Sequence, residues 1–240
     1  MTGMADLDAV TSAKKAAADY AVDTFVASGM RVGLGTGSTA VWAVRRVGER
    51  FASGALADVL AVPTSEATAA EAARCGVPLT SLDDHPVLDV TIDGADEVDP
   101  ELDCIKGGGG AHLREKLVAQ ASRRLVIVVD DSKRVPVLGT AFPLPVEVVR
   151  MARVPETLYV RSLGFDVTWR RRDGAPFVTD EGNWILDVAT GPILDKDGLL
   201  DRLLRRAGVV EVGLFLGMAS DLVVAHPGRD VEHLTRAPST

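Results

Sequence analysis

Residues 87–100 of the chain, VLDVTIDGADEVDP, contain the transition that decides the fold. An apolar run at 87–92 leads directly into the acidic turn Asp93–Pro100. A short apolar run of this kind is typical of a strand that is buried on both faces, as in a parallel sheet. The acidic turn is then expected at the carboxyl end of that strand, which is the edge where open α/β sheets bind ligands.

The same arrangement recurs on either side of this stretch. Helical patterns at about 11–28, 41–47, 66–75 and 111–123 alternate with the apolar runs, which predicts a Rossmann-like, mostly parallel sheet with helices on both faces, an α/β fold. Right-handed crossovers bring the strand ends to one edge. Three further loops follow apolar runs: GTGSTA (35–40), PTSEAT (63–68) and DDSK (130–133).

The pattern changes after about residue 139, where strand and helix signals no longer alternate strictly. FPLPVEVV (142–149), FDVTWRR (165–171), FVTDEGNWILDV (177–188) and helices near 155–163 and 199–206 indicate a smaller inserted α+β domain. The runs at 209–215 and 222–225 are expected to return to the main sheet. The predicted boundaries are 1–138 with 212–240 for the Rossmann-like catalytic domain, and 139–211 for the small domain.

The net charge of −8 argues against a nucleic-acid-binding protein, which normally carries a basic patch. The short basic groups at 170–172 and 205–206 are interpreted as solvated faces. Cys75 and Cys104 lack metal-ligand spacing and fit a reducing compartment. Neither a signal peptide nor a membrane-spanning run is evident, so we expect a cytoplasmic protein with no membrane partner.

The turn Gly35–Ala40 lies between a predicted strand and a helix, where backbone N–H groups and three hydroxyls favour phosphate binding. The letters also match a dinucleotide fingerprint, but the next strand does not end in the required acid. A Walker A loop is excluded because no lysine follows the glycines, and a plain tight turn remains the other interpretation. The candidate phosphate ligands are Thr36, Gly37, Ser38 and Thr39.

The acidic turn places Asp93 and Asp96 three residues apart at a strand end. Clustered carboxylates raise one another's proton affinity, which suits acid–base chemistry or proton sharing with sugar hydroxyls. A divalent metal site and a solvated acidic turn are the competing interpretations. Gly94 and Ala95 are expected to contact the same ligand.

The stretch KGGGGAHLREK (106–116) is the most specific in the chain. Consecutive glycines are costly to order and favour a role in presenting backbone N–H groups to a ligand. On this interpretation, an enediolate oxygen would be stabilised by Lys106 and by the N–H groups of Gly107, Gly108 and Gly109. Glu115 would abstract a proton next to a carbonyl. Taken alone, the position of Glu115 favours a surface residue of a helix over a catalytic base.

Two further residues near these motifs have less specific signals. His112 is a competing base, but a lone histidine is more often structural, and we leave it out of the catalytic set. Lys133 follows a predicted strand end and is either a ligand of the phosphate or substrate oxygens or a solvated lysine.

Taken together, these motifs resemble the ribose-5-phosphate isomerase A family over nearly the whole chain. The ordered matches are GTGST (35–39), TSEAT (64–68), DGADEVDP (93–100), KGGGGAHLREK (106–116), DDSK (130–133), PLPVEV (143–148), TDEGNWILDV (179–188) and GVVEVGLF (208–215).

The resemblance implies interconversion of D-ribose 5-phosphate and D-ribulose 5-phosphate in the pentose phosphate pathway, with no metal and no organic cofactor. It implies that Glu115 is the proton-transfer base, that Asp93, Asp96 and Lys106 also act in catalysis, and that the phosphate, sugar and lysine candidates named above contact substrate. Lys14 and Lys15 resemble a lysine pair near the phosphate. The family further implies a homodimer or homotetramer.

Three features depart from the family pattern: His112, the segment 216–219, and Trp184. Trp184 is bulkier than the pattern implies inside the small domain, and the segment 216–219 puts the C-terminal loop and the subunit contacts in question. The alternatives weighed are a non-catalytic sugar-phosphate sensor of the same fold, and a related acyl-CoA transferase or sugar-phosphate deaminase. The lysine–glycine–glutamate spacing argues against the last two.

Overall fold

The computed structural model describes residues 2–228 and 230–237 of the chain. It forms two compact units. Unit 1 comprises Met1–Ala95, Arg114–Lys133 and Met218–Thr240, and unit 2 comprises Asp96–Leu113 and Arg134–Gly217. The two units are defined by how compactly their residues pack. They do not test the predicted domain boundaries, which stay a prediction.

Unit 1 is built on a six-stranded sheet in the order β15-β14-β6-β3-β1-β2. All neighbouring strands are parallel except β14 and β15, which are antiparallel, so the predicted mostly parallel sheet is confirmed. The run at 222–225 joins this sheet as predicted. The strands are β1 (Arg31–Leu34), β2 (Leu60–Pro63), β3 (Val90–Asp93), β6 (Leu125–Asp130), β14 (Asp221–Ala225) and β15 (Glu232–Thr235).

Helices cover both faces of this sheet, as the alternating pattern predicts. Val32 and Leu34 of β1 belong to the core formed with α1, α2 and α3. Gly33, between them, faces the opposite side, where a Cβ atom would lie 2.6 Å from Val118 of α4. No helix within the described residues is long and apolar enough to cross a membrane. The helices are α1 (Thr2–Phe25), α2 (Ala40–Ala52), α3 (Glu66–Arg74) and α4 (His112–Gln120).

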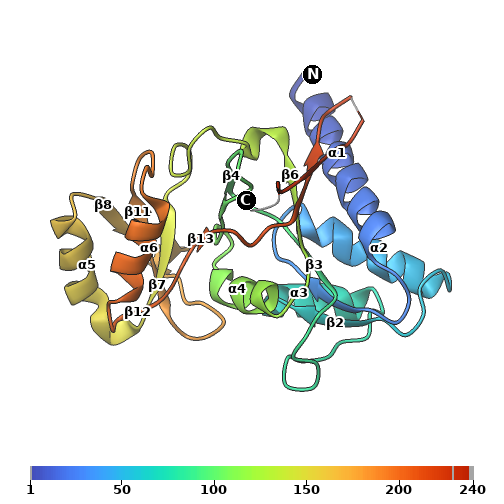
Figure 1. The fold of residues 1–240 in the computed structure, drawn as a ribbon, viewed down its shortest axis with the longest axis horizontal. Helices are drawn as coiled ribbons and strands as arrows, with labels where there is room; N and C mark the ends of the chain where they lie inside the picture. Colours follow the sequence, from blue (N-terminus) through green and yellow to red (C-terminus); the bar gives the residue numbers. More distant parts are fainter. Residues whose placement is uncertain (1, 229, 238–240) are drawn as a thin grey trace. The chain divides into compact units, whose positions relative to one another are not determined.

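Unit 2 contains a four-stranded antiparallel sheet in the order β12-β7-β11-β8. Helices α5 (Arg153–Ser162) and α6 (Lys196–Leu204) pack on one face of it, where Val146, Leu186 and Leu203 are fully buried (Figure 1). This is the predicted α+β module. Its strands are β7 (Leu144–Val148), β8 (Asp166–Trp169), β11 (Trp184–Ala189) and β12 (Val209–Val212).

Smaller elements complete unit 2. The strands β13 (Leu214–Phe215), β5 (Cys104–Ile105) and β4 (Glu97–Val98) form a three-stranded sheet, and β9 (Arg171–Arg172) pairs with β10 (Ala175–Pro176) as a hairpin. A short 3₁₀ turn occupies Arg150–Ala152 in unit 2. Another, Asp131–Lys133, ends the second segment of unit 1.

The prediction that residues 209–215 return to the main sheet is wrong. β12 pairs with β7 and β13 pairs with β5, so both belong to the sheets of unit 2. The run changes sheets at Gly213, whose N–H donates to Pro145 O at 2.8 Å and whose carbonyl accepts from Lys106 N–H at 2.9 Å. An apolar run carries no information about which sheet it joins, which is why the sequence misassigned it.

Candidate active site

Asp93 lies at the end of β3, beside the turn that follows β1. Because β1 and β3 are parallel neighbours, Gly35 and Asp93 meet at the carboxyl edge of the sheet. Asp93 is fully buried, and its Oδ1 accepts hydrogen bonds from the N–H groups of Thr36 at 3.1 Å and Gly94 at 2.7 Å. A Cβ atom at Gly35 would lie 2.1 Å from this oxygen, so the glycine is what lets the carboxylate approach the turn.

A cluster of hydroxyls fixes the same turn from the other side. The Thr36 Oγ1 lies 2.8 Å from the hydroxyls of Thr64 and Ser65 and 3.0 Å from that of Thr68. Thr68 also donates to the carbonyl of Gly35 at 3.0 Å. The TSEAT loop therefore shapes the GTGST turn, a role that the sequence analysis did not assign to it.

The outer part of the turn is formed by Gly37, Ser38 and Thr39. Gly37 has φ of +119°, in the region that favours glycine, and both Gly37 and Ser38 are exposed, while Thr39 is buried at the start of α2. The Nζ of Lys14 lies 3.3 Å from the Ser38 hydroxyl. A helix start with an adjacent ammonium group is well suited to an anionic group such as phosphate.

Asp130 lies next to Lys14 and Lys133 at this edge of the sheet. The Lys14 Nζ lies 3.3 Å from the Asp130 carboxylate, whereas Lys15 pairs with Asp19 at 2.6 Å. Burial would raise the pKa of Asp130, but hydrogen bonds from Ser132 and Lys14 and the nearby charge of Lys133 together lower it. Lys14 and the half-buried Lys133 are thus both next to an ionised carboxylate.

Glu115 is in the first turn of α4, and its side chain is buried, with 3% exposed. The alternative that it is an ordinary surface residue is therefore wrong. The spacing of apolar residues along α4 did not indicate which face of the helix is buried. Leu117, two residues after Glu115, is apolar but 48% exposed. Burying an ionisable side chain costs free energy, a cost that is common at functional sites.

In unit 2, the glycine tract follows β5. Lys106 is 2% exposed, and its ammonium group lies 5.3 Å from the centre of the Phe215 ring. Gly107 has φ of +109°, and Gly108 and Gly109 are exposed. Gly110 has φ of +84° and leaves no room for a Cβ atom, which would lie 2.3 Å from the ring of Phe177.

Arg170 holds the tract in place, and the sequence analysis missed it. Its guanidinium donates to the carbonyl oxygens of Gly107 at 2.6 Å and Gly108 at 3.2 Å, and Asp187 binds the same guanidinium at 2.5 and 3.0 Å. The interpretation of residues 170–172 as a solvated face is wrong for Arg170, whose side chain is 13% exposed. Gly107 and Gly108 are 63 and 62 residues away from Arg170, so no local pattern reveals these contacts.

Asp96 binds the other side of the tract. Its Oδ2 accepts the N–H of Gly108 at 2.7 Å, and a Cβ atom at Gly108 would lie 2.4 Å from its Oδ1. The N–H of Gly109, by contrast, has no acceptor among the described residues. Because the N–H and C=O of a trans peptide point in opposite directions, this N–H points away from Arg170.

His112 packs behind the tract, with no exposed surface. A Cβ atom at Gly107 would lie 2.7 Å from its Nδ1, and its Nε2 lies 3.9 Å from the Glu147 carboxylate. Glu147 accepts hydrogen bonds from Thr179 at 2.8 Å and Asn183 at 3.0 Å, and burial raises the pKa of its carboxyl. This buried position is consistent with a structural role for His112.

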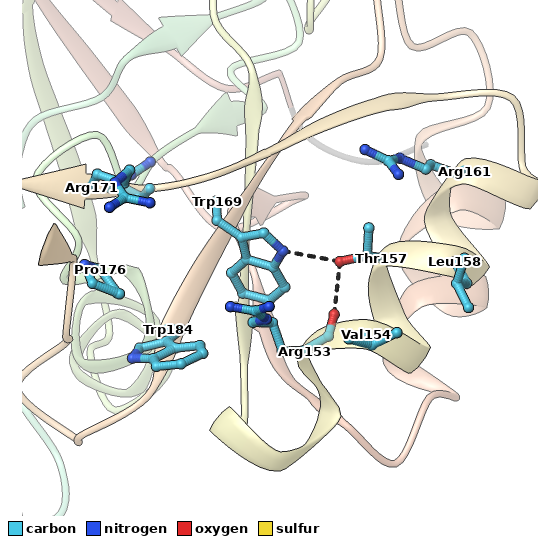
Figure 2. A pocket seen from close by; sticks show the side chains of 10 residues that line it. Arg153, Val154, Thr157, Leu158, Arg161, Trp169, Arg171, Pro176 and Trp184 are labelled. Atoms are coloured by element: carbon cyan, nitrogen blue, oxygen red, sulfur yellow. Dashed lines mark hydrogen bonds between the residues drawn. The ribbon is translucent and has the colours of Figure 1, made fainter. Parts of the chain in front are cut away.

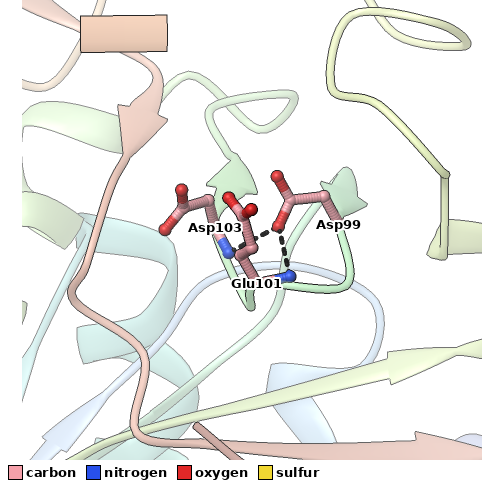
Figure 3. Close-up of side chains that lie close together, drawn as sticks. All are labelled: Asp99, Glu101 and Asp103. Atoms are coloured by element: carbon pink, nitrogen blue, oxygen red, sulfur yellow. Dashed lines mark hydrogen bonds between the residues drawn. The ribbon is translucent and has the colours of Figure 1, made fainter. Parts of the chain in front are cut away.

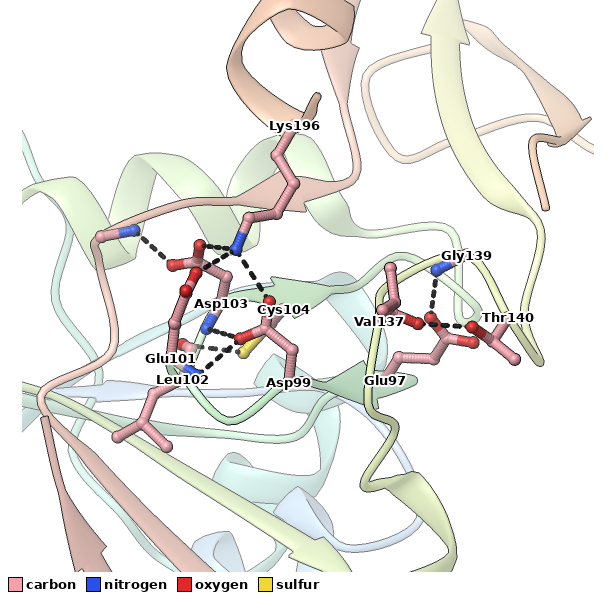
Figure 4. A network of polar contacts seen from close by, with 11 residues as sticks. Glu97, Asp99, Glu101, Leu102, Asp103, Cys104, Val137, Gly139, Thr140 and Lys196 are labelled. Carbon is pink, nitrogen blue, oxygen red and sulfur yellow. Dashed lines mark hydrogen bonds and ion pairs between the residues drawn. The ribbon is translucent and has the colours of Figure 1, made fainter. Parts of the chain in front are cut away.

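Three carboxylates, Asp99, Glu101 and Asp103, gather in the loop between β4 and β5, close enough to bind one cation (Figure 3). The ammonium group of Lys196 already lies among them, 2.6–2.8 Å from each (Figure 4). Burial would lower the pKa of Lys196, but these hydrogen bonds outweigh it and raise the pKa. A lysine therefore supplies the positive charge that a metal would bring.

Glu97, in the same acidic turn, also has a structural role. Its carboxylate accepts the N–H groups of Gly139 at 2.6 Å, Ala141 at 2.5 Å and Phe142 at 2.7 Å. Most of the acidic turn thus anchors unit 2, whereas Asp93 and Asp96 contact the two glycine-rich turns. Unit 1 brings together Asp93, Gly94, Thr36–Thr39 and the lysines, and unit 2 brings together Asp96 and Lys106–Gly109.

Comparison with known proteins gives a consistent result. The family model for ribose 5-phosphate isomerase A (phosphoriboisomerase A) matches residues 60–229. A ribose-5-phosphate isomerase A from Chloroflexus aurantiacus is 52% identical over 226 residues, which are 94% of each chain. One from Bradyrhizobium diazoefficiens is 50% identical and covers 88% of this chain and 91% of its own.

Solved structures agree with this result. The ribose 5-phosphate isomerase of Plasmodium falciparum has a TM-score of 0.91 at 38% identity, covering 94% of this chain and 98% of its own. A D-ribose-5-phosphate isomerase solved in complex with phospho-erythronic acid also has a TM-score of 0.91, at 34% identity, covering 95% and 99%.

Proposed function

This chain belongs to the ribose-5-phosphate isomerase A family, and from that premise we propose which of its residues carry out the reaction. The enzyme interconverts D-ribose 5-phosphate and D-ribulose 5-phosphate, an aldose–ketose isomerisation of the pentose phosphate pathway. The reaction moves a proton between C2 and C1 of the open-chain sugar through an enediolate.

Glu115 is the proposed base. Its carboxylate removes the C2 proton of the aldose and returns a proton to C1, and the reverse reaction uses the same group. The observation that carries this assignment is the burial of Glu115, which is 3% exposed in the first turn of α4. A carboxylate shielded from water is favoured as a proton acceptor next to a carbonyl group.

Lys106 and the glycine tract are proposed to stabilise the enediolate oxygen. Lys106 offers a buried ammonium group, and Gly109 offers an N–H that no described residue accepts. Arg170 and Asp96 fix the peptide groups on either side of Gly108, so this donor is oriented before the substrate binds. Preorganised donors at a developing oxyanion are typically the largest electrostatic contribution to such reactions.

The phosphate group of the substrate is assigned to Thr36–Thr39, with Lys133 and Lys14 supplying positive charge. The N–H groups at the start of α2 and the Ser38 hydroxyl beside Lys14 support this assignment. In a relative, phospho-erythronic acid is a bound ligand, and it carries a phosphate and a carboxylate resembling the enediolate. The same two charged groups are what the turn and the glycine tract are proposed to recognise here.

Asp93 and Asp96 are proposed to bind sugar hydroxyls and to assist ring opening, with Gly94 and Ala95 in contact with the sugar. Both carboxylates accept backbone N–H groups at glycine-rich turns, which supports a fixed orientation of their remaining oxygens. We further propose that the enzyme needs no metal or organic cofactor, works in the cytoplasm, and forms a homodimer or homotetramer.

The substitution Glu115→Gln tests the base assignment, because it keeps the shape of the side chain and removes its basicity. We expect kcat to fall by about 10²–10⁴ while substrate affinity stays within a few-fold. Glu49→Gln, on the exposed surface of α2, is the matched control and is expected to leave kcat unchanged. Ribulose 5-phosphate formation is measured with and without a chelator; a Glu115→Gln variant of normal kcat contradicts the assignment.

A further inference from the structure

Unit 2 contains a cavity of about 340 Å³ whose lining includes none of the proposed catalytic or substrate-binding residues, although Arg170, which anchors the glycine tract, forms part of its wall. Its walls are α5 on one side and the β9–β10 hairpin with Trp184 on the other, and Trp169 lies between them (Figure 2). Small-molecule sites have volumes of about 300–1,000 Å³, so this cavity is large enough for a ligand of mononucleotide size.

The cavity is strongly positive although the chain as a whole has a net charge of −8. Four of its ten lining residues are arginines and none is acidic, but one of the four, Arg170, is paired with Asp187. Among the described residues, neither the Arg153 nor the Arg161 guanidinium has a carboxylate partner. Glu156, on the same helix, does not neutralise them, because it is buried and paired with Arg206 at 2.9 Å.

The remaining lining is aromatic and apolar. The rings of Trp169 and Trp184 contact each other edge to face, with centroids 6.0 Å apart. The Trp169 indole N–H donates to the Thr157 hydroxyl at 3.0 Å, which fixes the orientation of the ring. Val154 and Leu158 on α5 are 55% and 61% exposed, so the cavity wall leaves apolar surface uncovered.

We propose that this cavity binds a small ligand in which a planar aromatic ring carries a phosphate or similar anionic group, such as a mononucleotide. The ring packs against Trp184 and Trp169, since indole faces are favourable stacking surfaces for nucleobases. The anionic group binds Arg153 and Arg161, whose planar guanidinium groups match the oxygens of a phosphate.

The charge of the cavity favours this ligand over a second copy of the chain. In a two-fold contact the same surface lies on both partners, so the arginines of one copy would face those of the other. That arrangement places like charges together and is unfavourable. A small anionic ligand neutralises them instead.

The test measures binding of AMP to the full chain carrying Trp42→Phe, so that only Trp169 and Trp184 contribute tryptophan fluorescence. AMP contains a ribose 5-phosphate group, and the titration therefore runs with saturating ribose 5-phosphate to occupy the isomerase site. Adenosine and inorganic phosphate are titrated separately. The variants are Arg153→Gln/Arg161→Gln, Trp184→Ala, and the control Arg205→Gln, which removes an exposed arginine directly after α6 and outside the cavity.

We expect a saturable fluorescence change with AMP at a Kd below about 1 mM, and weaker binding of adenosine and of phosphate. The double arginine variant raises the Kd for AMP by about tenfold or more, and Arg205→Gln leaves it unchanged. Trp184→Ala weakens the binding of AMP but not the binding of phosphate. Isomerase kcat/KM stays the same in the arginine variants, since neither arginine has a role in the proposed reaction.

Three results overturn the proposal. One is the absence of saturable AMP binding at concentrations up to about 10 mM. Another is an AMP affinity that the double arginine variant leaves unchanged or that ribose 5-phosphate abolishes, because AMP would then bind elsewhere. The third is a change of oligomeric state in the double arginine variant by analytical ultracentrifugation, which would assign this surface to a second copy.

Discussion

At the scale of single residues, Glu147 has an environment that is unusual for a carboxylate. It is 1% exposed on β7, and its partners Thr179 and Asn183 both donate to the same oxygen, Oε1. Burial raises the pKa of Glu147, and the charges of Glu181 and Glu211 act in the same direction. The neutral form is thereby favoured in the folded protein relative to the unfolded chain.

This environment predicts a specific pH dependence of stability. Because the folded-state pKa of Glu147 is raised, the native state binds more protons than the unfolded state once the pH exceeds the unfolded value of about 4.3. Its contribution to stability is therefore lost as the pH rises through the raised pKa. In Glu147→Gln, Oε1 still accepts both hydrogen bonds, and the side chain no longer titrates. The Tm of the variant relative to that of the wild type should therefore increase as the pH rises.

The measurement is thermal unfolding between pH 4 and pH 9, with Glu49→Gln, an exposed carboxylate of α2 in unit 1, as the control. A Tm difference between Glu147→Gln and wild type that stays constant over this range would contradict the raised pKa. The expected control result is a much smaller pH-dependent change, because Glu49 is exposed and does not act on the pKa of Glu147.

At the scale of elements, two glycines of unit 2 differ in what a side chain would meet. Gly110 of the glycine tract and Gly174 of the β9–β10 hairpin have similar backbone angles, with φ of +84° and +80°. A Cβ atom at Gly110 would collide with Phe177, whereas at Gly174 it would meet open space. The pair separates the cost of the backbone angle from the cost of the collision.

We predict that Gly174→Ala lowers the free energy of unfolding by about 1 kcal/mol, the cost of a left-handed alanine. Gly110→Ala is expected to cost a further 1–3 kcal/mol or so because the Phe177 ring must move. It is also expected to lower kcat/KM, since the tract that holds Gly109 shifts. Equal losses in the two variants by urea unfolding would show that the collision is relieved without cost.

The elements themselves were largely predictable from the sequence, because buried parallel strands are short apolar runs that end at turns. The sheet to which residues 209–215 belong was not, since Gly213 changes the pairing through contacts with Pro145 and Lys106 that no local pattern encodes. The anchoring of Gly107 by Arg170 and the burial of Glu115 were missed for the same reason. The motifs around Asp93 and Lys106 stood out in the sequence because glycines and carboxylates gather there at predicted strand ends, and their part in the reaction stays a prediction.

At the scale of the whole molecule, the stability of unit 2 depends on Lys196, which connects α6 to the loop between β4 and β5. Asp99 and Asp103, two of its three partners, are buried, with 7% and 6% exposed. The Asp103 carboxylate also accepts the N–H of Gly217 at 2.8 Å, so the same group holds the end of unit 2.

Lys196→Met should destabilise the protein by about 2 kcal/mol or more, because it leaves clustered carboxylates without a counter-charge. Ca²⁺ should recover part of the lost Tm in the variant, since oxygen ligands are then open to a cation, and should not affect the wild type. Lys15→Met, which breaks a half-exposed pair with Asp19, is the control and is expected to cost less than about 1 kcal/mol. A Tm of Lys196→Met equal to that of the wild type would contradict this role of Lys196.

Glu115 is proposed to move the proton between C2 and C1 of ribose 5-phosphate. NMR detects this transfer as deuterium that enters the sugar phosphate while the enzyme works in D₂O. We expect the wild type to incorporate deuterium at C1 of ribulose 5-phosphate and C2 of ribose 5-phosphate, and Glu115→Gln to do so more slowly by about 10²-fold or more. Incorporation by Glu115→Gln at the wild-type rate would show that another group moves the proton.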